Sequence, residues 1–200
     1  MSAIDPRALF YVEGSERVGV RNQSGEANVK ISLATDATVL RLIPFRNKQE
    51  MIEAALARFR FQHLPAPGNY TRAGQYRLAW AGRNCWHMIC SPATATLEQE
   101  LTEALVGLAA ISDASDGLLR LEIAGKNAVK LMTKGCVLDL DSFQPGHCAV
   151  TLMAHTRLHI HRVSDTGFEL MIPASYAASF CEWLRISAAE FEPDIDPAFG

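Results

Sequence analysis

Apolar and polar positions along the first half of the chain follow the two periods that distinguish strands from helices. Alternation or a short apolar run is typical of a strand and predicts strands at residues 39–43, 76–80, 85–90 and 109–113. Spacings of three and four residues are typical of amphipathic helices and give apolar stripes at Ile52, Ala55, Leu56 and Phe59 and at Leu97, Leu101, Leu105 and Leu108. Asn47 and Glu50 are spaced as a capping box, so we expect them to begin the first helix.

The second half repeats this order of elements without repeating the sequence. Strands are predicted at residues 119–123, 149–154, 158–163 and 168–172. A short helix begins at Ala128 and ends before Gly135, and a closing helix capped by Ser175 carries its apolar stripe at Tyr176, Phe180, Trp183 and Leu184. Each half therefore predicts a ferredoxin-like βαββαβ-type unit. The expected fold class is α+β, with helices packed on two largely antiparallel sheets.

The pattern is weaker at both ends of the chain, which divides the sequence into three regions. Residues 1–28 are mixed and polar and predict an N-terminal arm that needs a neighbour to order it. Residues 29–191 predict the folded domain, with similar halves at about 29–115 and 116–191. Residues 192–200 are acidic and interrupted by proline, and predict a C-terminal tail.

Composition and charge exclude several classes of protein. Nineteen Lys and Arg residues against twenty-two Asp and Glu residues give a net charge of -3, which argues against a nucleic-acid partner. No apolar run approaches the roughly 20 residues that span a bilayer, and charged residues near the start leave no core for a signal peptide. The five cysteines are odd in number and scattered, which predicts free thiols. We expect a cytoplasmic protein with partner contacts at the arm, the tail and the 62–74 loop, through Tyr70 and Arg72.

One glycine-bearing turn has part of the pattern of a phosphate-binding loop. Gly125 and Lys126 follow a predicted strand and precede a predicted helix. A P-loop needs a glycine where this chain has Arg120 and a serine or threonine where it has Asn127. We interpret the segment as an ordinary strand-to-helix turn, and no dinucleotide fingerprint of three spaced glycines occurs in the sequence.

Three histidines form the most metal-like cluster of the sequence. His159 and His161 point the same way on a predicted strand because side chains alternate with a period of two, and His155 lies just before them. Such a pair can hold a metal if a third ligand converges on it. We favour a solvated or interface face, with Leu158 and Ile160 supplying the buried face of the strand, and keep a metal-binding protein as an alternative.

An acidic cluster is the remaining candidate for chemistry. Asp113, Ser115 and Asp116 include the groups that acid–base catalysis uses. They lie at a predicted strand end before Gly117, where Asp and Ser commonly make turn hydrogen bonds, and we favour that interpretation. No signature of a nucleophile with its base is present. The sequence therefore assigns no catalytic, cofactor-binding or metal-binding residue.

Several short segments of the second half nevertheless form a recognisable pattern. Ile-Ser-Asp-Ala-Ser-Asp-Gly occupies residues 111–117, and Lys-Gly-Cys-Val-Leu-Asp-Leu, the most specific stretch, occupies residues 134–140. Further matching positions lie at 119–125, 143, 145–149, 151–152, 168–170, 173–177 and 183–184. In this pattern the chain resembles the gamma subunits of heterotetrameric sarcosine oxidases over roughly residues 37–191.

The resemblance implies a fold, partners and the absence of a cofactor in this chain. The fold would be related to the folate-binding domain of the glycine-cleavage T-protein, an aminomethyltransferase. The complex would be an αβγδ heterotetramer that oxidatively demethylates sarcosine to glycine. In that family FAD, FMN, NAD and tetrahydrofolate are held by the alpha and beta subunits and zinc by the delta subunit. We therefore expect a non-catalytic accessory subunit whose partners are the alpha, beta and delta subunits.

One departure from the T-protein pattern bears on folate. T-protein relatives carry an Asp-Asp-Leu stretch whose acid contacts folate, and aligning its leucine with Leu158 places Thr156 and Arg157 at the acidic positions. Reversing the charge there should abolish recognition of the folate amine groups. Two alternatives stay open: a stand-alone folate-dependent aminomethyltransferase-like protein, and the equivalent subunit of an N-methyl amino acid dehydrogenase.

Overall fold

The computed structural model describes residues 28–195 and divides the chain into two compact units. Unit 2 is one stretch, Asp36–Asp116, together with Gly146–Ala149. Among the described residues, unit 1 comprises 28–35, 117–145 and 150–195. The predicted N-terminal arm lies outside the described residues except for Asn28. Residues 192–195 of the predicted acidic tail are described, and Asp194 and Ile195 pair with Lys30 and Ile31.

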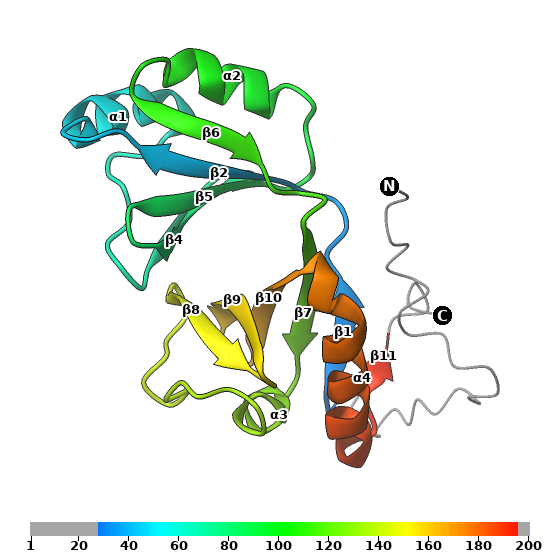
Figure 1. Ribbon diagram of the computed structural model, residues 1–200. Helices are drawn as coiled ribbons and strands as arrows, with labels where there is room; N and C mark the ends of the chain where they lie inside the picture. Colours follow the sequence, from blue (N-terminus) through cyan, green and yellow to red (C-terminus); the bar gives the residue numbers. More distant parts are fainter. Residues whose placement is uncertain (1–27, 196–200) are drawn as a thin grey trace. The chain divides into compact units, whose positions relative to one another are not determined.

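Unit 2 is a five-stranded antiparallel sheet with both of its α-helices on one face (Figure 1). Its elements are β2 (Thr38–Pro44), α1 (Gln49–Leu56), the 3-10 turn η2 (Ala57–Phe59), β3 (Tyr70–Ala73), β4 (Tyr76–Gly82), β5 (Cys85–Cys90), α2 (Leu97–Ala104) and β6 (Ala109–Asp113). The strand order is β3-β4-β5-β2-β6. Without the edge strand β3, this is the predicted ferredoxin-like βαββαβ arrangement.

The core of unit 2 forms between the helices and the sheet because both predicted stripes face inward. Ile52 and Leu56 from α1 and Leu97 and Leu101 from α2 are fully buried. They belong to one apolar cluster with alternate residues of three strands, namely Leu40, Leu42, Leu78, Met88 and Cys90. The apolar residues that alternate along the strands and those spaced three and four apart on the helices thus pack together in a single core.

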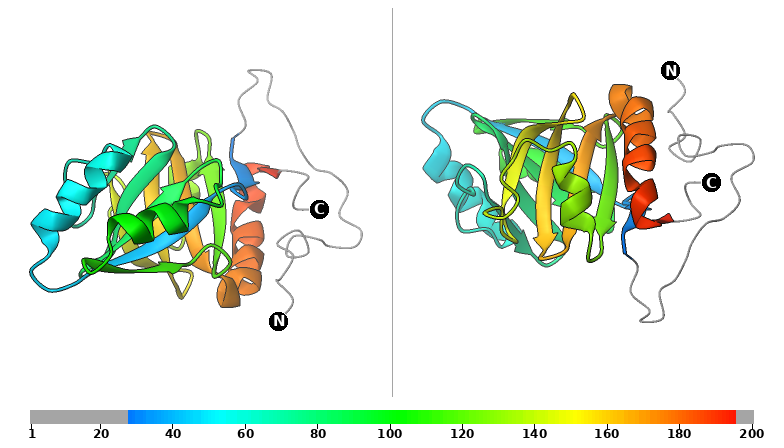
Figure 2. Two further views of the ribbon diagram at one scale, coloured as in Figure 1. Left: turned by 90° about the horizontal axis from the view of Figure 1, so that it is seen from above. Right: turned by 90° about the horizontal axis from the view of Figure 1, so that it is seen from below.

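Unit 1 is a six-stranded sheet that repeats the order of elements of unit 2. Its elements are β1 (Lys30–Leu33), β7 (Leu118–Ala124), α3 (Ala128–Thr133), β8 (Cys148–Met153), β9 (Thr156–Ser164), β10 (Gly167–Pro173), η3 (Ala174–Tyr176), α4 (Ala177–Ala188), η4 (Ala189–Phe191) and β11 (Asp194–Ile195). The strand order is β11-β1-β7-β10-β9-β8. Figure 2 shows α3 lying across the strands of this unit.

The strand beside β7 comes from the start of the described chain and not from the end of the second half. In unit 2 the place beside β2 is taken by β6, which follows α2. In unit 1 the equivalent place beside β7 is taken by β1, which pairs antiparallel from Lys30 to Leu33. The structure therefore differs from the predicted halves at residues 29–35, because those residues complete the sheet of the second half.

The two faces of β7 and β10 differ in chemistry. Register places Leu121 beside Leu170 and Ile123 beside Phe168, and all four side chains are buried. On the other face, Arg120 donates to Glu169 Oε1 from Nε at 3.1 Å and from Nη2 at 2.9 Å, and both side chains are buried. Arg120 Nη1 also donates to the carbonyl of Ala34. A buried charge is tolerated when it is paired in this way.

The segment Lys134–Cys136, the centre of the sequence pattern, ties the end of α3 to α4. Lys134 Nζ donates to the Ser187 carbonyl at 2.6 Å, at the C-terminal end of α4, and lies 2.7 Å from Glu190 Oε1 in η4. A cation at this place also meets the negative end of the α4 dipole. A Cβ added at Gly135 would lie 2.5 and 2.8 Å from two ring atoms of Trp183. Close packing against α4 therefore explains why glycine stands at this position.

The rest of that loop is held by one buried arginine. Arg162 Nη1 donates to the carbonyls of Leu140 at 2.6 Å and Phe143 at 2.7 Å, and Nη2 donates to the carbonyl of Asp165 at 2.6 Å. The guanidinium also lies 5.2 Å from the centre of the Phe168 ring. Residues 134–140, the most specific stretch of the sequence pattern, thus contribute to the packing of unit 1.

Both predicted helix caps are wrong. Asn47 has a φ of 59°, so it lies in the left-handed region and not at the extended cap position. The cap residue of α1 is Lys48, with no side-chain hydrogen bond. Ser175 falls inside η3, and the cap residue of α4 is Tyr176, again with no side-chain bond.

Replacing Gly135 with alanine should lower the free energy of unfolding by about 1–3 kcal/mol, because the added methyl group has no space beside Trp183. Combining it with Trp183→Leu should cost at least about 1 kcal/mol less than the sum of the two single substitutions. Urea unfolding of the four proteins measures this coupling. Strictly additive effects would show that the ring does not require glycine.

Candidate functional site

The acidic cluster of the sequence forms a turn within unit 2. Ser115 donates to Asp113 Oδ1 from its backbone N at 2.7 Å and from its hydroxyl at 2.6 Å. The same hydroxyl accepts from the Val39 amide at 2.9 Å. These bonds satisfy the turn between β6 and β7, which confirms the structural interpretation.

The glycine-bearing segment at residues 125–127 is also a turn. The Gly125 amide donates to the Thr166 carbonyl at 3.1 Å, and the Asn127 amide donates to the Asn28 carbonyl at 3.0 Å. Asn127 is the residue before α3. These amides are used by the protein itself, so they do not form the nest of free donors that cradles a phosphate.

The three histidines differ in their surroundings. His155 lies in the β8–β9 turn with a φ of 63°. Leu158 and Ile160 are buried as predicted. His159 is half-buried, whereas His161 is only 1% exposed, so the prediction of a solvated or interface face is wrong for His161. Among residues 28–195, no three His, Cys, Asp or Glu side chains gather closely enough to hold a metal ion.

All five cysteines are free thiols, and three of them are buried. Burial raises the pKa of Cys148 from its ordinary value to about 12, and burial likewise raises the pKa of Cys181 to about 12. The thiolate is the nucleophilic form of cysteine. Neither thiol is therefore a nucleophile near neutral pH.

The predicted contact loop is more ordered than the sequence suggests. Tyr70 is buried at the start of β3, and the guanidinium groups of Arg72 and Arg77 lie 5.8 and 5.5 Å from the centre of its ring. The tyrosine is thus part of the packing of unit 2, and the prediction that it is an interface residue is wrong.

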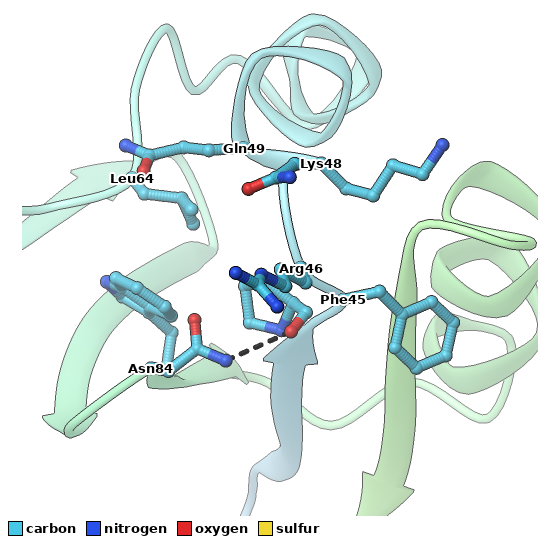
Figure 3. Close-up of a pocket in the computed structure, with 9 residues that line it drawn as sticks. Phe45, Arg46, Lys48, Gln49, Leu64 and Asn84 are labelled. Carbon is cyan, nitrogen blue, oxygen red and sulfur yellow. Dashed lines mark hydrogen bonds between the residues drawn. The ribbon is translucent and has the colours of Figure 1, made fainter.

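The structure instead presents a pocket of about 400 Å³ in unit 2, where β2 leads into α1 (Figure 3). Its lining comes from the β2–α1 connection, the loop before β3 and the β4–β5 turn, and consists of Pro44, Phe45, Arg46, Asn47, Lys48, Gln49, Leu64, Asn84 and Trp86. Trp86 is half-buried and packs against the core of unit 2 from one side. Sequence pattern alone did not reveal this pocket, because its residues come from three separate segments.

Hydrogen bonds fix the uncharged polar side chains of the pocket. Asn84 Nδ2 donates to the Pro44 carbonyl at 3.0 Å, and Trp86 Nε1 donates to the Pro65 carbonyl at 3.0 Å. Gln49 Nε2 donates to Glu53 Oε1 at 3.2 Å. Figure 3 shows the Asn84 side chain turned toward the middle of the lining residues. The pocket walls are therefore held in place before any ligand binds.

Glu53 does not line the pocket, but its carboxylate accepts hydrogen bonds from two lining residues, Gln49 and Leu64. Its Oε1 accepts from the Leu64 amide at 3.2 Å, and its Oε2 lies 3.4 Å from His63 Nδ1. Burial alone would raise the pKa of Glu53, but the bonds from Gln49, Leu64 and His63 outweigh it and lower the pKa. The Glu53 carboxylate is therefore ionised near neutral pH and keeps its hydrogen bonds to Gln49 and Leu64.

The charged residues that line the pocket are both cations, Arg46 and Lys48. Neither has a carboxylate partner within residues 28–195. Beside them, Ile43, Phe45 and Met51 expose 40%, 47% and 53% of their surface. Large apolar side chains exposed next to one another are typical of a surface that meets another protein.

Comparison with known proteins identifies the family of the chain. The profile of the sarcosine oxidase gamma subunit family matches residues 50–190, which is more than two thirds of the sequence. The chain belongs to this family. No curated protein sequence matches it.

Two solved structures share the fold of this gamma-family chain. A chain of the heterotetrameric sarcosine oxidase from Corynebacterium sp. U-96, in complex with pyrrole 2-carboxylate, is 22% identical with a TM-score of 0.74, and the match covers 84% of this chain and 87% of that one. The glycine cleavage system aminomethyltransferase T from Bartonella henselae is 14% identical with a TM-score of 0.63. That match covers 87% of this chain and 49% of the other, so the gamma-family chain spans about half the length of the aminomethyltransferase. The expected T-protein-like fold is confirmed.

The thiols of this gamma-family chain provide a test of burial. At pH 8, alkylation of Cys148 and Cys181 in the native protein should be at least about 100-fold slower than in urea, because the fold suppresses the thiolate and blocks access. Mass spectrometry of the five labelled peptides measures each rate, with half-buried Cys85 and Cys136 as internal controls. Equal labelling of Cys181 in native and unfolded protein would contradict the packing.

Proposed function

We propose that this chain is the non-catalytic accessory gamma subunit of a heterotetrameric sarcosine oxidase that demethylates sarcosine to glycine. The observation that carries this proposal is the match of the gamma-subunit family to residues 50–190. The fold shared with a chain of the Corynebacterium sarcosine oxidase supports it. The residues most specific to the sequence pattern, Lys134 and Gly135, pack unit 1 together, which suits a structural role.

The exposed apolar residues also support a role inside an assembly. Several large side chains are exposed in both units, namely Ile43, Phe45, Met51, Val106, Val137, Leu152, Tyr176 and Ile186. Val106 and Val137 expose 77% and 74% of their surface. Burying such surfaces against other chains is a main source of association free energy.

We place the partners and cofactors of the complex outside this chain. The alpha, beta and delta subunits would be its partners, with FAD, FMN, NAD, tetrahydrofolate and zinc held by them. Within the described residues, Arg157 is exposed and Thr156 is buried on β9, at the positions where T-protein relatives carry acids. A basic residue does not suit the amine groups of folate, which supports a chain without a folate site of its own.

The location follows from this proposal. None of the helices within residues 28–195 is long and apolar enough to cross a membrane. As a subunit of a catabolic oxidase, the chain would work in the cytoplasm.

Co-expression of this chain with candidate alpha, beta and delta subunits tests the proposal. An affinity tag on this chain should recover all four chains in equal amounts, and light scattering of the eluted peak should give the mass of one heterotetramer. The purified complex should oxidise sarcosine, while the chain alone should show no turnover. A chain that stays monomeric at micromolar concentration beside these subunits would refute the proposal.

A further inference from the structure

The pocket of unit 2 has an unbalanced charge. Its lining contains Arg46 and Lys48 and no acid. Elsewhere in the unit, acids gather on α2, where Glu98, Glu100 and Glu103 follow its first residue. Glu50 and the ionised Glu53 lie on α1 close to the pocket, but neither pairs with Arg46 or Lys48, so both cations are without a carboxylate partner among residues 28–195. Such a site attracts carboxylates.

The start of α1 adds to this positive field. The helix begins at Gln49, and no side chain caps its N-terminus. Unsatisfied amide groups and the helix dipole place partial positive charge there. Glu50 in the first turn offsets part of it, so we regard this contribution as secondary to Arg46 and Lys48.

The walls of the pocket suit an apolar side chain rather than a small polar solute. Leu64 is buried in one wall and half-buried Trp86 forms part of another. The indole N–H of Trp86 is already bonded to Pro65, which leaves its ring for apolar contact. Asn84 Nδ2 is bonded to Pro44, which leaves the amide oxygen as an acceptor for a backbone N–H. An acidic peptide with one apolar anchor can satisfy all three groups.

The surroundings of the pocket favour a protein over a free small molecule. Small-ligand sites usually bury most of their ligand. This pocket is instead continuous with the exposed side chain of Phe45, which Figure 3 shows pointing away from the other lining residues. The Phe45 amide donates to the Leu108 carbonyl at 2.8 Å, so this side chain is presented from a fixed backbone.

We propose that this pocket is the docking site for an acidic segment of another subunit, which places an aromatic or aliphatic side chain against Trp86 and Leu64, one carboxylate beside Arg46 and a second carboxylate beside the outward-pointing Lys48. The inference rests on the proposed function, since it names where and how this chain holds a partner. It goes further by assigning a specific recognition chemistry to unit 2.

Charge reversal within the assembled complex tests the proposal. The double substitution Arg46→Glu with Lys48→Glu should reduce the affinity of this chain for the rest of the complex at least about tenfold, because attraction becomes repulsion at the docked carboxylates. The control, Lys126→Glu with Lys130→Glu, makes the same change in net charge on exposed residues of another unit and should leave affinity unchanged. Equal thermal unfolding temperatures of the isolated variants and wild type would exclude misfolding.

A zero-length carbodiimide crosslink identifies the occupant without any substitution. Figure 3 shows the Lys48 side chain extending away from the pocket centre, where its amine is available to a carboxylate. Mass spectrometry of the wild-type complex should find Lys48 joined to an Asp or Glu of another subunit. A link to a second copy of this chain, or no link together with unchanged affinity of the charge-reversed variant, would overturn the inference while leaving the proposed function intact. Failure of the wild-type chain to assemble at all would overturn both.

Discussion

The pairing of β1 with β7 is the constraint on which the rest of the structure depends. Leu33 lies beside Leu121, and the Ala34 amide donates to the Arg120 carbonyl at 3.1 Å, immediately before the chain leaves for unit 2. The chain returns at Gly117 to begin β7. Unit 2 is therefore an insertion between two neighbouring strands of one sheet. Unit 1 cannot complete its sheet until the residues on both sides of that insertion have met, which makes this contact strongly non-local.

The two units use one order of elements for different purposes. In unit 1, Lys134 and Gly135, which follow α3, contact α4, and Arg162 donates hydrogen bonds to carbonyl groups of the loop that comes after them. In unit 2, the residues that precede α1 remain accessible, and they carry the unpaired cations and exposed Phe45. Repetition of a fold thus does not repeat its surface chemistry, and function must be argued from the site.

Most of the fold could be predicted from the sequence, because the spacing of apolar residues follows the buried face of each strand and helix. The ranges predicted for β5 and β6 agree with the structure, since both strands have strong apolar patterns between clear turns. The short strands β1, β3 and β11 were missed, because strands of two to four residues are too short to establish a period. The caps at Asn47 and Ser175 failed for another reason, as residue type predicts a cap only if the backbone enters the helix from an extended conformation.

The candidate site was harder to predict than the fold. Family resemblance depended on Lys134 and Gly135, which are recognisable because packing against α4 restricts them. Arg46 and Trp86 have no such local signature, since they meet only when β2 and β5 pair and bring Leu42 beside Trp86. A site assembled from separate segments by strand register leaves no motif in the linear sequence.

Hydrogen–deuterium exchange of this chain, alone and in the purified complex, tests the central claim most directly. If the chain is an accessory subunit held through unit 2, assembly should slow exchange of the amides in residues 43–51 at least about tenfold, because the partner excludes water from that surface. The peptide covering residues 97–104 on the acidic helix α2 serves as an internal reference and should change little. Unchanged exchange at residues 43–51 in a stoichiometric complex, with protection confined to other segments, would contradict the account.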